Sequence, residues 1–254
     1  MPEWEYRRWD EDSLTRAMQE PNLNPSLEGR TPKQAHNQSQ DTKIWLDFMP
    51  TYVQQAYEAR KFAFVSDYVR LWALEQYGGL YMDVDFEVYR PFDDLMDKYP
   101  AFAGYEGSKR KPVMQGVIAS EPHGAWVRDM LSTYDHRHFI LPDGSIDLTP
   151  NTSFFSDRLE SQGAILDGVE KDIYVSIHNT SNITHQTFFL HVFPVHYFCP
   201  GLTTGENLRN EETYCEHKGE SSWAVNKSWK AKMLSCFGSK WKIRIIKLKR
   251  KLLG

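Results

Sequence analysis

The chain has 254 residues, of which 41% are hydrophobic and 25% charged, and its formal net charge is −4. These values are ordinary for a globular protein, and the length suits one large α/β domain without a linker. There is no secretory signal and no apolar run of about 18 residues, so we expect no membrane-spanning segment. The three cysteines lack metal-ligand spacing and leave one unpaired, which favours reduced thiols in a cytosolic protein.

The first third of the chain predicts a loop followed by helices. Residues 21–39 are rich in Pro, Asn, Gln and Ser and predict a surface loop. Residues 41–64 predict a helix in two pieces with a break near Pro50. Residues 66–77 predict another helix, which ends at Gly78-Gly79 because glycine adopts the left-handed conformation without a Cβ penalty.

A strand is predicted directly after these glycines, over residues 80–88. Hydrophobic side chains alternate strictly with polar ones, so the pattern places the two sets on opposite faces. The polar face carries Tyr81, Asp83, Asp85 and Glu87. The Cα atoms of Asp83 and Asp85 would then lie roughly 6.6 Å apart, at about 3.3 Å per residue.

Two carboxylates on one face repel each other unless a cation or a hydrogen-bond donor compensates them. Oxygen ligands in so small a number suit Mg²⁺ or Mn²⁺, which keep positions open for water and phosphate oxygens. The alternative interpretation of Asp83 and Asp85 is a pair of solvated carboxylates. Asp67 and Arg70 are spaced i and i+3 on the preceding helix and share one face; the alternative for this pair is an ordinary surface ion pair.

Strands and helices alternate through the rest of the chain. Short strands are predicted over residues 101–104 and 116–120, around a charged loop at 106–111, and another over 187–195. Helices are predicted over 124–134 and 150–163, with Thr149 as the cap of the second. Residues 151–153 at that helix start either face an anion or sugar or only cap the helix. The alternation predicts a sheet with most strands parallel and ligands at their carboxyl ends.

The last 17 residues, 238–254, contain seven basic residues and no acidic one. On a helical wheel Trp241, Ile245, Leu248 and Leu252 form one stripe, so the segment predicts a basic amphipathic helix. Such a helix suits the anionic inner face of a membrane. Nucleic-acid binding and a solvated tail are the alternatives, and of these partners we expect the membrane surface and no nucleic acid.

The segment from Ser66 to Pro91 resembles the sugar-binding Asp-x-Asp region of glycosyltransferase family 32. The shared pattern is Ser-Asp-Tyr-x-Arg on a helix, then Tyr-Gly-Gly-x-Tyr-x-Asp-x-Asp and a hydrophobic-Arg-Pro turn. That family includes yeast initiating mannosyltransferases and bacterial capsule and O-antigen enzymes, and the segment is also similar to the glucosyltransferase domain of the large clostridial toxins. Weaker similarities lie at residues 4–12, 116–124 and 217–223.

The resemblance implies a GT-A (Rossmann-like) fold, a nucleotide-sugar donor, a divalent cation and retention of anomeric configuration. It implies a catalytic set of Asp67, Arg70, Asp83 and Asp85. Asp83 would contact the ribose or sugar directly or through the metal, Asp85 would ligate Mn²⁺ or Mg²⁺, and Asp67 and Arg70 would bind the sugar. Arg70 would also reach the diphosphate, because its planar guanidinium pairs with phosphate oxygens.

Further donor contacts are implied on both sides of this set. Tyr81 would bind a phosphate, with core packing as the alternative. His217 and Ser222 would complete the metal site or contact the diphosphate, and Trp223 would cover it.

In that family a first strand near Pro-Lys-x-Ile-His-x-x-Trp holds the nucleotide base, and this sequence starts at the second strand. We therefore expect the first strand to be missing or supplied differently. We expect a catalytic domain over residues 1–237 and a basic tail over 238–254.

Three functions remain open. The first is a metal-dependent, retaining glycosyltransferase, peripheral on the cytoplasmic face of the membrane, with a glycan or polyprenyl-linked acceptor. The second is a phosphatase of the haloacid-dehalogenase kind, whose Asp-x-Asp normally continues x-Thr/Val, whereas Phe86-Glu87 follows here. The third is a non-catalytic sugar-nucleotide or glycan-binding relic, which the missing first strand favours.

Overall fold

The computed structural model describes residues 4–19, 44–107, 113–178, 185–201, 207–218 and 243–248. Its strands are β1 Trp4–Trp9, β2 Gly79–Met82, β3 Phe86–Val88, β4 Ala101–Gly104, β5 Val117–Ser120, β6 Lys171–His178, β7 His185–Phe193, β8 Cys215–His217 and β9 Ile243–Leu248. Its helices are α1 Glu11–Gln19, α2 Ile44–Asp47, α3 Thr51–Glu58, α4 Phe62–Tyr77, α5 Asp93–Lys98, α6 Ala125–Ser132, α7 Asn151–Ser161 and α8 Val195–Phe198, with a 3₁₀ turn η2 at Thr133–His136.

The described strands form a seven-stranded sheet in the order β1-β9-β2-β5-β4-β7-β6 and a two-stranded sheet of β3 and β8. In the large sheet only β4 and β7 pair in parallel among the described strands, and the other neighbours are antiparallel. The expectation of a mostly parallel sheet was wrong. Strands β1, β2 and β4 do run in one direction, but β9 and β5 lie between them and run the opposite way. Direct neighbours are therefore antiparallel.

The co-directional strands nevertheless finish at one edge of the sheet. Met82 of β2 is paired with Val117 of β5, and Ala101 of β4 is paired with Ser120 at the other end of β5. The carboxyl ends of β2 and β4 therefore lie at the same edge, and the chain leaves β2 there into Asp83. Ligand sites at the carboxyl ends of strands need only this shared direction.

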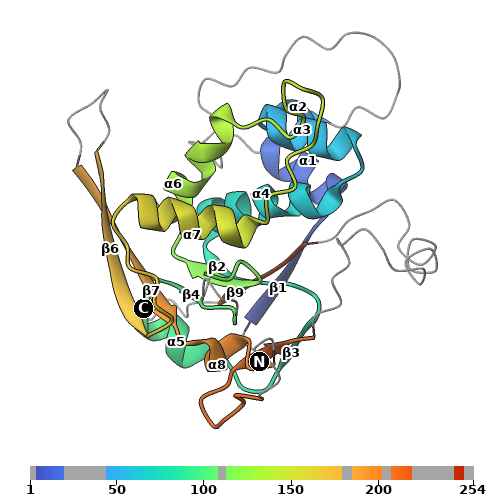
Figure 1. The fold of residues 1–254 in the computed structure, drawn as a ribbon. Coiled ribbons are helices and arrows are strands. Elements are labelled where there is room, and N and C mark those ends of the chain that lie inside the picture. Colours follow the sequence, from blue (N-terminus) through green and yellow to red (C-terminus); the bar gives the residue numbers. More distant parts are fainter. Residues whose placement is uncertain are drawn as a thin grey trace.

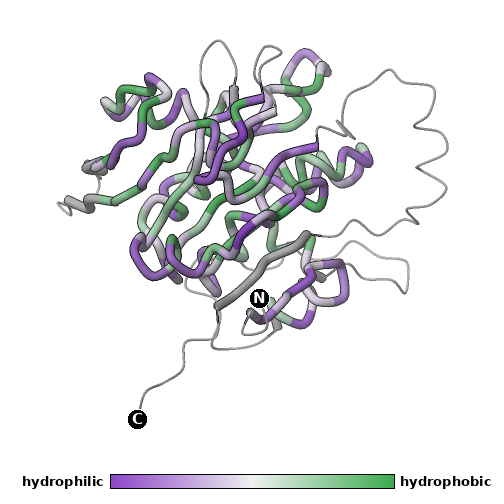
Figure 2. Tube along the Cα trace, turned by 90° about the horizontal axis from the view of Figure 1, so that it is seen from below, coloured by the Kyte–Doolittle hydropathy of each residue, from purple (hydrophilic) through white to green (hydrophobic). Residues whose placement is uncertain are grey.

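The middle of the large sheet is buried on both faces, because the side chains of β2 alternate between two hydrophobic clusters. Tyr81 packs with α1, α3, α4, α6 and α7 on one side, and Leu80 and Met82 pack with Phe92, Phe198 and Tyr214 on the other. Figure 1 shows most of the helices, including α1, α3, α4, α6 and α7, on one side of the sheet, and α5, α8 and β3 on the other side. In Figure 2 the hydrophobic stretches lie mainly inside the molecule.

The helix and strand boundaries confirm most of the sequence predictions in the central region. The helices expected over 41–64 break at Pro50, and a further break at 59–61 separates α3 from α4. The predicted strands near 101, 116 and 187 and the predicted helices near 124 and 150 are β4, β5, β7, α6 and α7. Pro150 occupies the cap position of α7 and makes no side-chain cap hydrogen bond, so the expected cap at Thr149 was wrong.

Two other expectations were wrong. The strand predicted over 80–88 is interrupted, because β2 ends at Met82 and β3 starts at Phe86 in the smaller sheet. The predicted C-terminal helix is replaced by strand β9 over Ile243–Leu248, which fills the position between β1 and β2. An alternation of apolar and basic residues supports either element, and the open strand edges favour the strand. The rest of the tail, residues 238–242 and 249–254, lies outside the described ranges.

Candidate functional site

The two acidic residues of the Asp-x-Asp motif lie in a turn at the carboxyl end of β2. The backbone N–H of Asp83 donates to the carbonyl of Gly116 at 2.8 Å, which ties this turn to the start of β5. Val84 is 68% exposed at the tip of the turn. The N–H of Lys218 donates to the carbonyl of Asp85 at 2.9 Å and joins the turn to β8. The motif therefore lies where the two sheets meet.

Arg70 of α4 organises one side of this turn. Its side chain is buried, and its Nη2 lies 2.8 Å from Oδ1 of Asp67. Its Nη1 donates to the carbonyl of Gln115 at 2.7 Å and lies 3.6 Å from Oδ1 of Asp83. The guanidinium also covers the ring of Tyr81 at 4.6 Å from its centroid. One cation thus compensates two carboxylates from two different elements.

Burial controls the protonation of Asp67 and Tyr81. It raises the pKa of Asp67 to about 6, against the opposing effect of Arg70 and with a smaller contribution from Asp83 in the same direction. Burial also raises the pKa of Tyr81 well above its ordinary value. The Tyr81 hydroxyl donates to Oδ1 of Asp83, and the ring is 3% exposed. Tyr81 therefore supports Asp83 from within the core.

Asp85 faces the opposite side of the turn, toward β8. Its Oδ2 lies 3.0 Å from Nε2 of His217. His217 is paired with Phe86 in the smaller sheet, and the two rings lie 4.8 Å apart between centroids. Burial lowers the pKa of His217, but the hydrogen bond to Asp85 and the charges of Asp85, Asp83 and Glu106 outweigh burial and raise it.

The Asp85–His217 pair has the donor chemistry of a divalent cation site. A carboxylate oxygen and an imidazole nitrogen each bind such ions at about 2.0–2.2 Å, so two adjacent ligands of one ion lie about 3 Å apart, as these two atoms do. Within the described ranges no group of three or more His, Cys, Asp or Glu side chains could hold an ion. The pair fits an ion that takes its other ligands from water and phosphate oxygens, as Mg²⁺ does.

Close packing holds this turn in place. A Cβ on Gly116 would lie 3.0 Å from Oδ2 of Asp83 and 2.8 Å from the ring of Phe86. Only glycine fits there without moving the Asp-x-Asp turn.

Two amide side chains extend the site toward α7. The Nδ2 of Asn151 lies 3.4 Å from Oε1 of Gln115, and Oδ1 of Asn151 lies 3.4 Å from the hydroxyl of Tyr134. Gln115 is 2% exposed, and its Nε2 is buried without a hydrogen-bond partner. A buried amide without a partner costs stability unless something else binds it.

Glu106 joins the site from the loop after β4. Burial raises the pKa of its carboxyl, and the hydroxyl of Thr152 and the charge of His217 act in the opposite direction. The first turn of α7 therefore lies beside the site, with Thr152 near Glu106 and Asn151 near Gln115.

The structure thus brings together six of the residues expected from the sequence. Asp67, Arg70, Tyr81 and Asp83 form one cluster, and Asp85 and His217 form a pair beside it. Ser222 and Trp223 lie outside the described residues. The sequence analysis missed Gln115 and Glu106 as parts of the site. Glu106 stands in the charged loop that the sequence singled out, whereas Gln115 carries no signal, because it acts through its backbone carbonyl and a buried amide.

Comparisons with known proteins match the N-terminal part of the chain, which contains the Asp-x-Asp motif. Residues 1–102 match the family model described as "Glycosyltransferase sugar-binding region containing DXD motif", and this range includes Asp67, Arg70, Asp83 and Asp85. A curated protein of Cryptococcus neoformans var. grubii serotype A, "Glucan organizing enzyme 1", is 33% identical over 84 residues. The match covers 30% of this chain and 23% of that protein, so the chain spans less than a quarter of its relative's length. No solved structure matches.

The family match and the clustered residues identify the same part of the chain. Residues 1–102 are therefore similar to a glycosyltransferase sugar-binding region that contains a DXD motif, in agreement with the resemblance of the sequence motif.

Proposed function

We propose that this protein is a glycosyltransferase that moves a sugar from a nucleoside-diphosphate sugar to a hydroxyl group of a glycan acceptor. The observation that carries the proposal is the Asp83–Asp85 turn, which lies between the Asp67–Arg70 pair of α4 and His217 of β8. Carboxylates on one side suit the hydroxyl groups of a sugar, and the acid–imidazole pair on the other suits a metal-bound diphosphate.

Asp85 and His217 would hold Mn²⁺ or Mg²⁺. Their donor atoms are 3.0 Å apart. His217 lies in β8, and Asp85 directly precedes β3, the partner of β8 in the smaller sheet. When bound, such an ion acts as a Lewis acid that neutralises the charge of a departing diphosphate.

The chain's own side chains would bind and orient the sugar. The Asp67 carboxylate would accept hydrogen bonds from sugar hydroxyl groups, and the ion pair between its Oδ1 and Nη2 of Arg70, 2.8 Å apart, fixes its position. The unpartnered Nε2 of Gln115 offers a donor, and Asn151 beside it offers a further amide. Arg70 and Tyr81 serve as positioning residues in this proposal, because their polar atoms already contact Asp67, Asp83 and the carbonyl of Gln115.

The reaction breaks the bond between the anomeric carbon and the diphosphate oxygen, and the diphosphate leaves with the electron pair. The acceptor hydroxyl forms the new bond from the same face and gives its proton to a diphosphate oxygen. Retention then needs no covalent sugar–enzyme bond. The carboxylates of Asp67 and Asp83 are both engaged with Arg70, and Asp83 also accepts from Tyr81, which supports a route without a protein nucleophile.

The GT-A fold, a polyprenyl-linked acceptor and attachment to the inner membrane face are finer proposals. Charge supports the last of them, because residues 238–254 hold seven basic residues and each basic residue near an anionic surface contributes about 1 kcal/mol. The described helices include none that is both long and apolar enough to cross a bilayer.

Release of nucleoside diphosphate from a panel of nucleotide sugars tests the proposal, with and without oligosaccharide acceptors. We expect release from one donor, faster with acceptor. Release from no donor by the folded protein would contradict the proposal and favour a non-catalytic binding protein, which equilibrium binding of the same panel would identify.

A further inference from the structure

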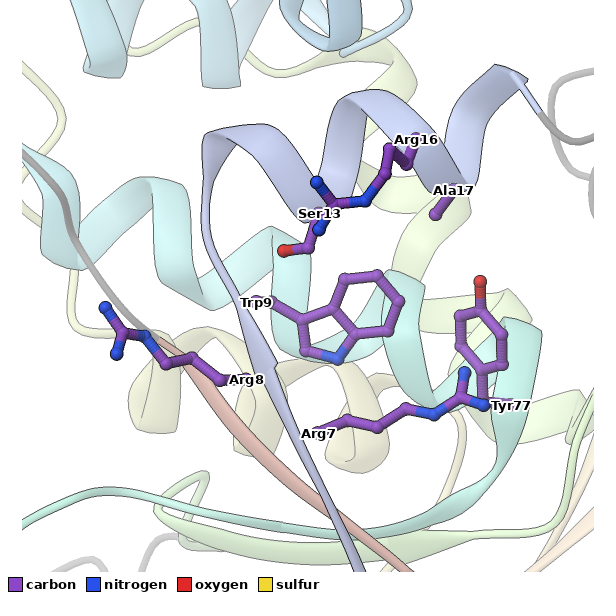
Figure 3. Close-up of a pocket in the computed structure, with 7 residues that line it drawn as sticks. All are labelled: Arg7, Arg8, Trp9, Ser13, Arg16, Ala17 and Tyr77. Atoms are coloured by element: carbon purple, nitrogen blue, oxygen red, sulfur yellow. The ribbon is translucent and has the colours of Figure 1, made fainter.

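A second polar pocket lies at the edge of the large sheet, between β1 and α1. Its chemistry is determined by six of the residues that line it, namely Arg7, Arg8, Trp9, Ser13, Arg16 and Tyr77. The cavity measures about 240 Å³. We call it the arginine pocket, and Figure 3 shows it in close-up.

The Arg7 guanidinium is fixed in this pocket before any ligand arrives. It lies 4.7 Å from the ring centroid of Tyr77, and its Nε donates to Glu5 at 2.9 Å. The Tyr77 ring in turn lies 5.1 Å from the indole of Trp9. Trp9 is buried, so it forms a rigid apolar floor below the charged groups.

Arg8 and Arg16 bring two more positive charges to the pocket. Both are exposed, and no ion pair of either is found within the described residues. In Figure 3 Arg16 reaches over the indole of Trp9 from α1, and Arg8 extends from the other side of β1. The nearby Ser13 hydroxyl donates to the Asp10 carboxylate at the start of α1.

Glu5 forms an ion pair with Arg7, whereas Arg8 and Arg16 have no ion pair within the described residues. Like charges close to one another are unfavourable unless an anion compensates them. Guanidinium groups pair with phosphate oxygens through two parallel hydrogen bonds, which makes arginine suited to phosphate groups. At about 240 Å³ the cavity is smaller than the ~300 Å³ of an ordinary ligand pocket. It therefore suits a phosphate or diphosphate group better than a complete nucleotide sugar.

The arginine pocket is separate from the Asp-x-Asp site. Tyr77 ends α4, whereas Asp67 lies ten residues earlier on the same helix, which corresponds to about 15 Å at 1.5 Å per residue. In the sheet, β9 lies between β1 and β2. A ligand in the pocket would therefore leave the Asp85–His217 pair free.

We propose that the arginine pocket binds a phosphate-bearing ligand, with Arg7, Arg8 and Arg16 as the anion-binding groups and Trp9 and Tyr77 as its apolar wall. The proposal does not rest on sugar transfer, because it needs neither the donor nor a metal.

Calorimetric titration of the full chain with inorganic pyrophosphate, in EDTA, tests it. The chelator prevents a metal–diphosphate complex at Asp85. We expect saturable binding that the double variant Arg8→Gln/Arg16→Gln weakens at least tenfold, since each lost charge-assisted bond costs about one order of magnitude. Arg60→Gln is the matched control: Arg60 is exposed, in the link before α4, and its variant should bind like the wild type.

Thermal unfolding shows whether the double variant is folded. We expect it to be folded, because both side chains are exposed. No saturable binding by the wild type, or equal binding by the double variant, would overturn the proposal. Equal binding would place the anion elsewhere, such as at Arg70.

A second titration distinguishes a free phosphate from a lipid headgroup as the source. Dihexanoyl phosphatidic acid, below its micelle concentration, offers the same phosphate with two short acyl chains. Affinity similar to that of pyrophosphate supports a free anion, and tighter binding that is lost in the double variant supports a lipid phosphate.

Discussion

At the scale of single residues, Arg70 is the centre of the candidate site. One buried guanidinium faces Asp67, Asp83 and the carbonyl of Gln115, all within 3.6 Å. Removal of such a cation leaves two carboxylates uncompensated in a poorly solvated place. The site is therefore an electrostatic unit whose members depend on one another, and single substitutions report on the unit.

Asp67 links stability to pH. Its pKa is raised from 3.8 to about 6, chiefly by burial, so the folded protein binds more protons than the unfolded chain between these values. Stability must then fall as pH rises from about 4 to about 6, by at most about 3 kcal/mol from this residue. Asp67→Asn should lose this decrease. Urea unfolding at pH 4, 5, 6 and 7 measures it, with Asp157→Asn, an exposed acid in α7, as the control.

Equal pH slopes for the wild type and Asp67→Asn would contradict the raised pKa. A slope of opposite sign would mean that the ion pair with Arg70 dominates over burial.

Asn151 should act on substrate binding and not on folding. Asn151→Ala removes an amide that faces Gln115 and Tyr134 at 3.4 Å, both contacts being weak by length. We expect kcat/KM for the donor to fall about 10- to 100-fold, the cost of one or two lost polar contacts to substrate, with thermal stability unchanged. Ser153→Ala in the same helical turn is the control. Equal kinetics for both variants would remove Asn151 from the site.

At the scale of elements, the joint between α4 and β2 positions the motif. Gly78 has φ +61° and ψ −170°, a region that only glycine occupies readily. Glu75, fully buried one turn earlier, lies 3.0 Å from Nδ1 of His123 and 3.2 Å from Nε of Arg128. These contacts hold the end of α4 against the turn before α6, and so fix the direction in which β2 leaves.

Gly78→Ala should destabilise the protein by about 2–4 kcal/mol. The new Cβ would lie 2.5 Å from Cδ of Pro122 and would add the backbone strain of a positive φ. Gly144→Ala is a matched control, because Gly144 has φ +81° and nothing within 4 Å of its Cβ position. Its expected cost is the strain alone, about 1–2 kcal/mol. Equal losses in urea unfolding would show that contact with Pro122 does not matter.

How far the sequence predicts these elements depends on whether the signal is local. The end of α4 at Gly78, the break at Pro50 and the Asp67–Arg70 spacing are local, and the structure confirms their positions. The end of β2 at Met82 was missed because the alternation of residues 80–88 continues through the turn. What ends the strand is long-range pairing, of β2 with β5 and of β3 with β8.

The same distinction applies to the site. The motif residues could be predicted because their spacing carries the chemistry. Gln115 could not, because its role comes from a loop that tertiary packing brings beside Arg70. The C-terminal strand was missed for a similar reason, since an alternation of basic and apolar residues permits either a helix or a strand and the partner strands decide.

At the scale of the whole molecule, the first and last described strands, β1 and β9, lie side by side in the large sheet. Six residues of β1, Trp4–Trp9, pair with β9, and β9 in turn pairs with β2. In the described sheet β1 has β9 as its neighbour and contacts α1 on the helical side. The C-terminal strand therefore completes the sheet that carries both the Asp-x-Asp turn and the arginine pocket.

Truncation tests this arrangement. Removal of residues 243–254 takes β9 away and should destabilise the protein by more than about 2 kcal/mol, because β1 loses its strand partner and the apolar edges of β1 and β2 become exposed. Removal of residues 249–254 alone should change the free energy of unfolding by less than about 0.5 kcal/mol. Equal stability of the two truncated proteins would show that β9 contributes no pairing energy.

The most direct test of the central claim is metal-dependent release of nucleoside diphosphate by the wild type and by Asp85→Asn, measured with Mn²⁺, Mg²⁺ or EDTA. We predict release by the wild type with metal, none with EDTA, and at least a hundredfold loss in Asp85→Asn, which keeps the size of the side chain but removes the charge of a metal ligand. Asp143→Asn should behave like the wild type. Undiminished, metal-dependent release by folded Asp85→Asn would contradict the assignment of the Asp85–His217 pair as the donor-binding metal site.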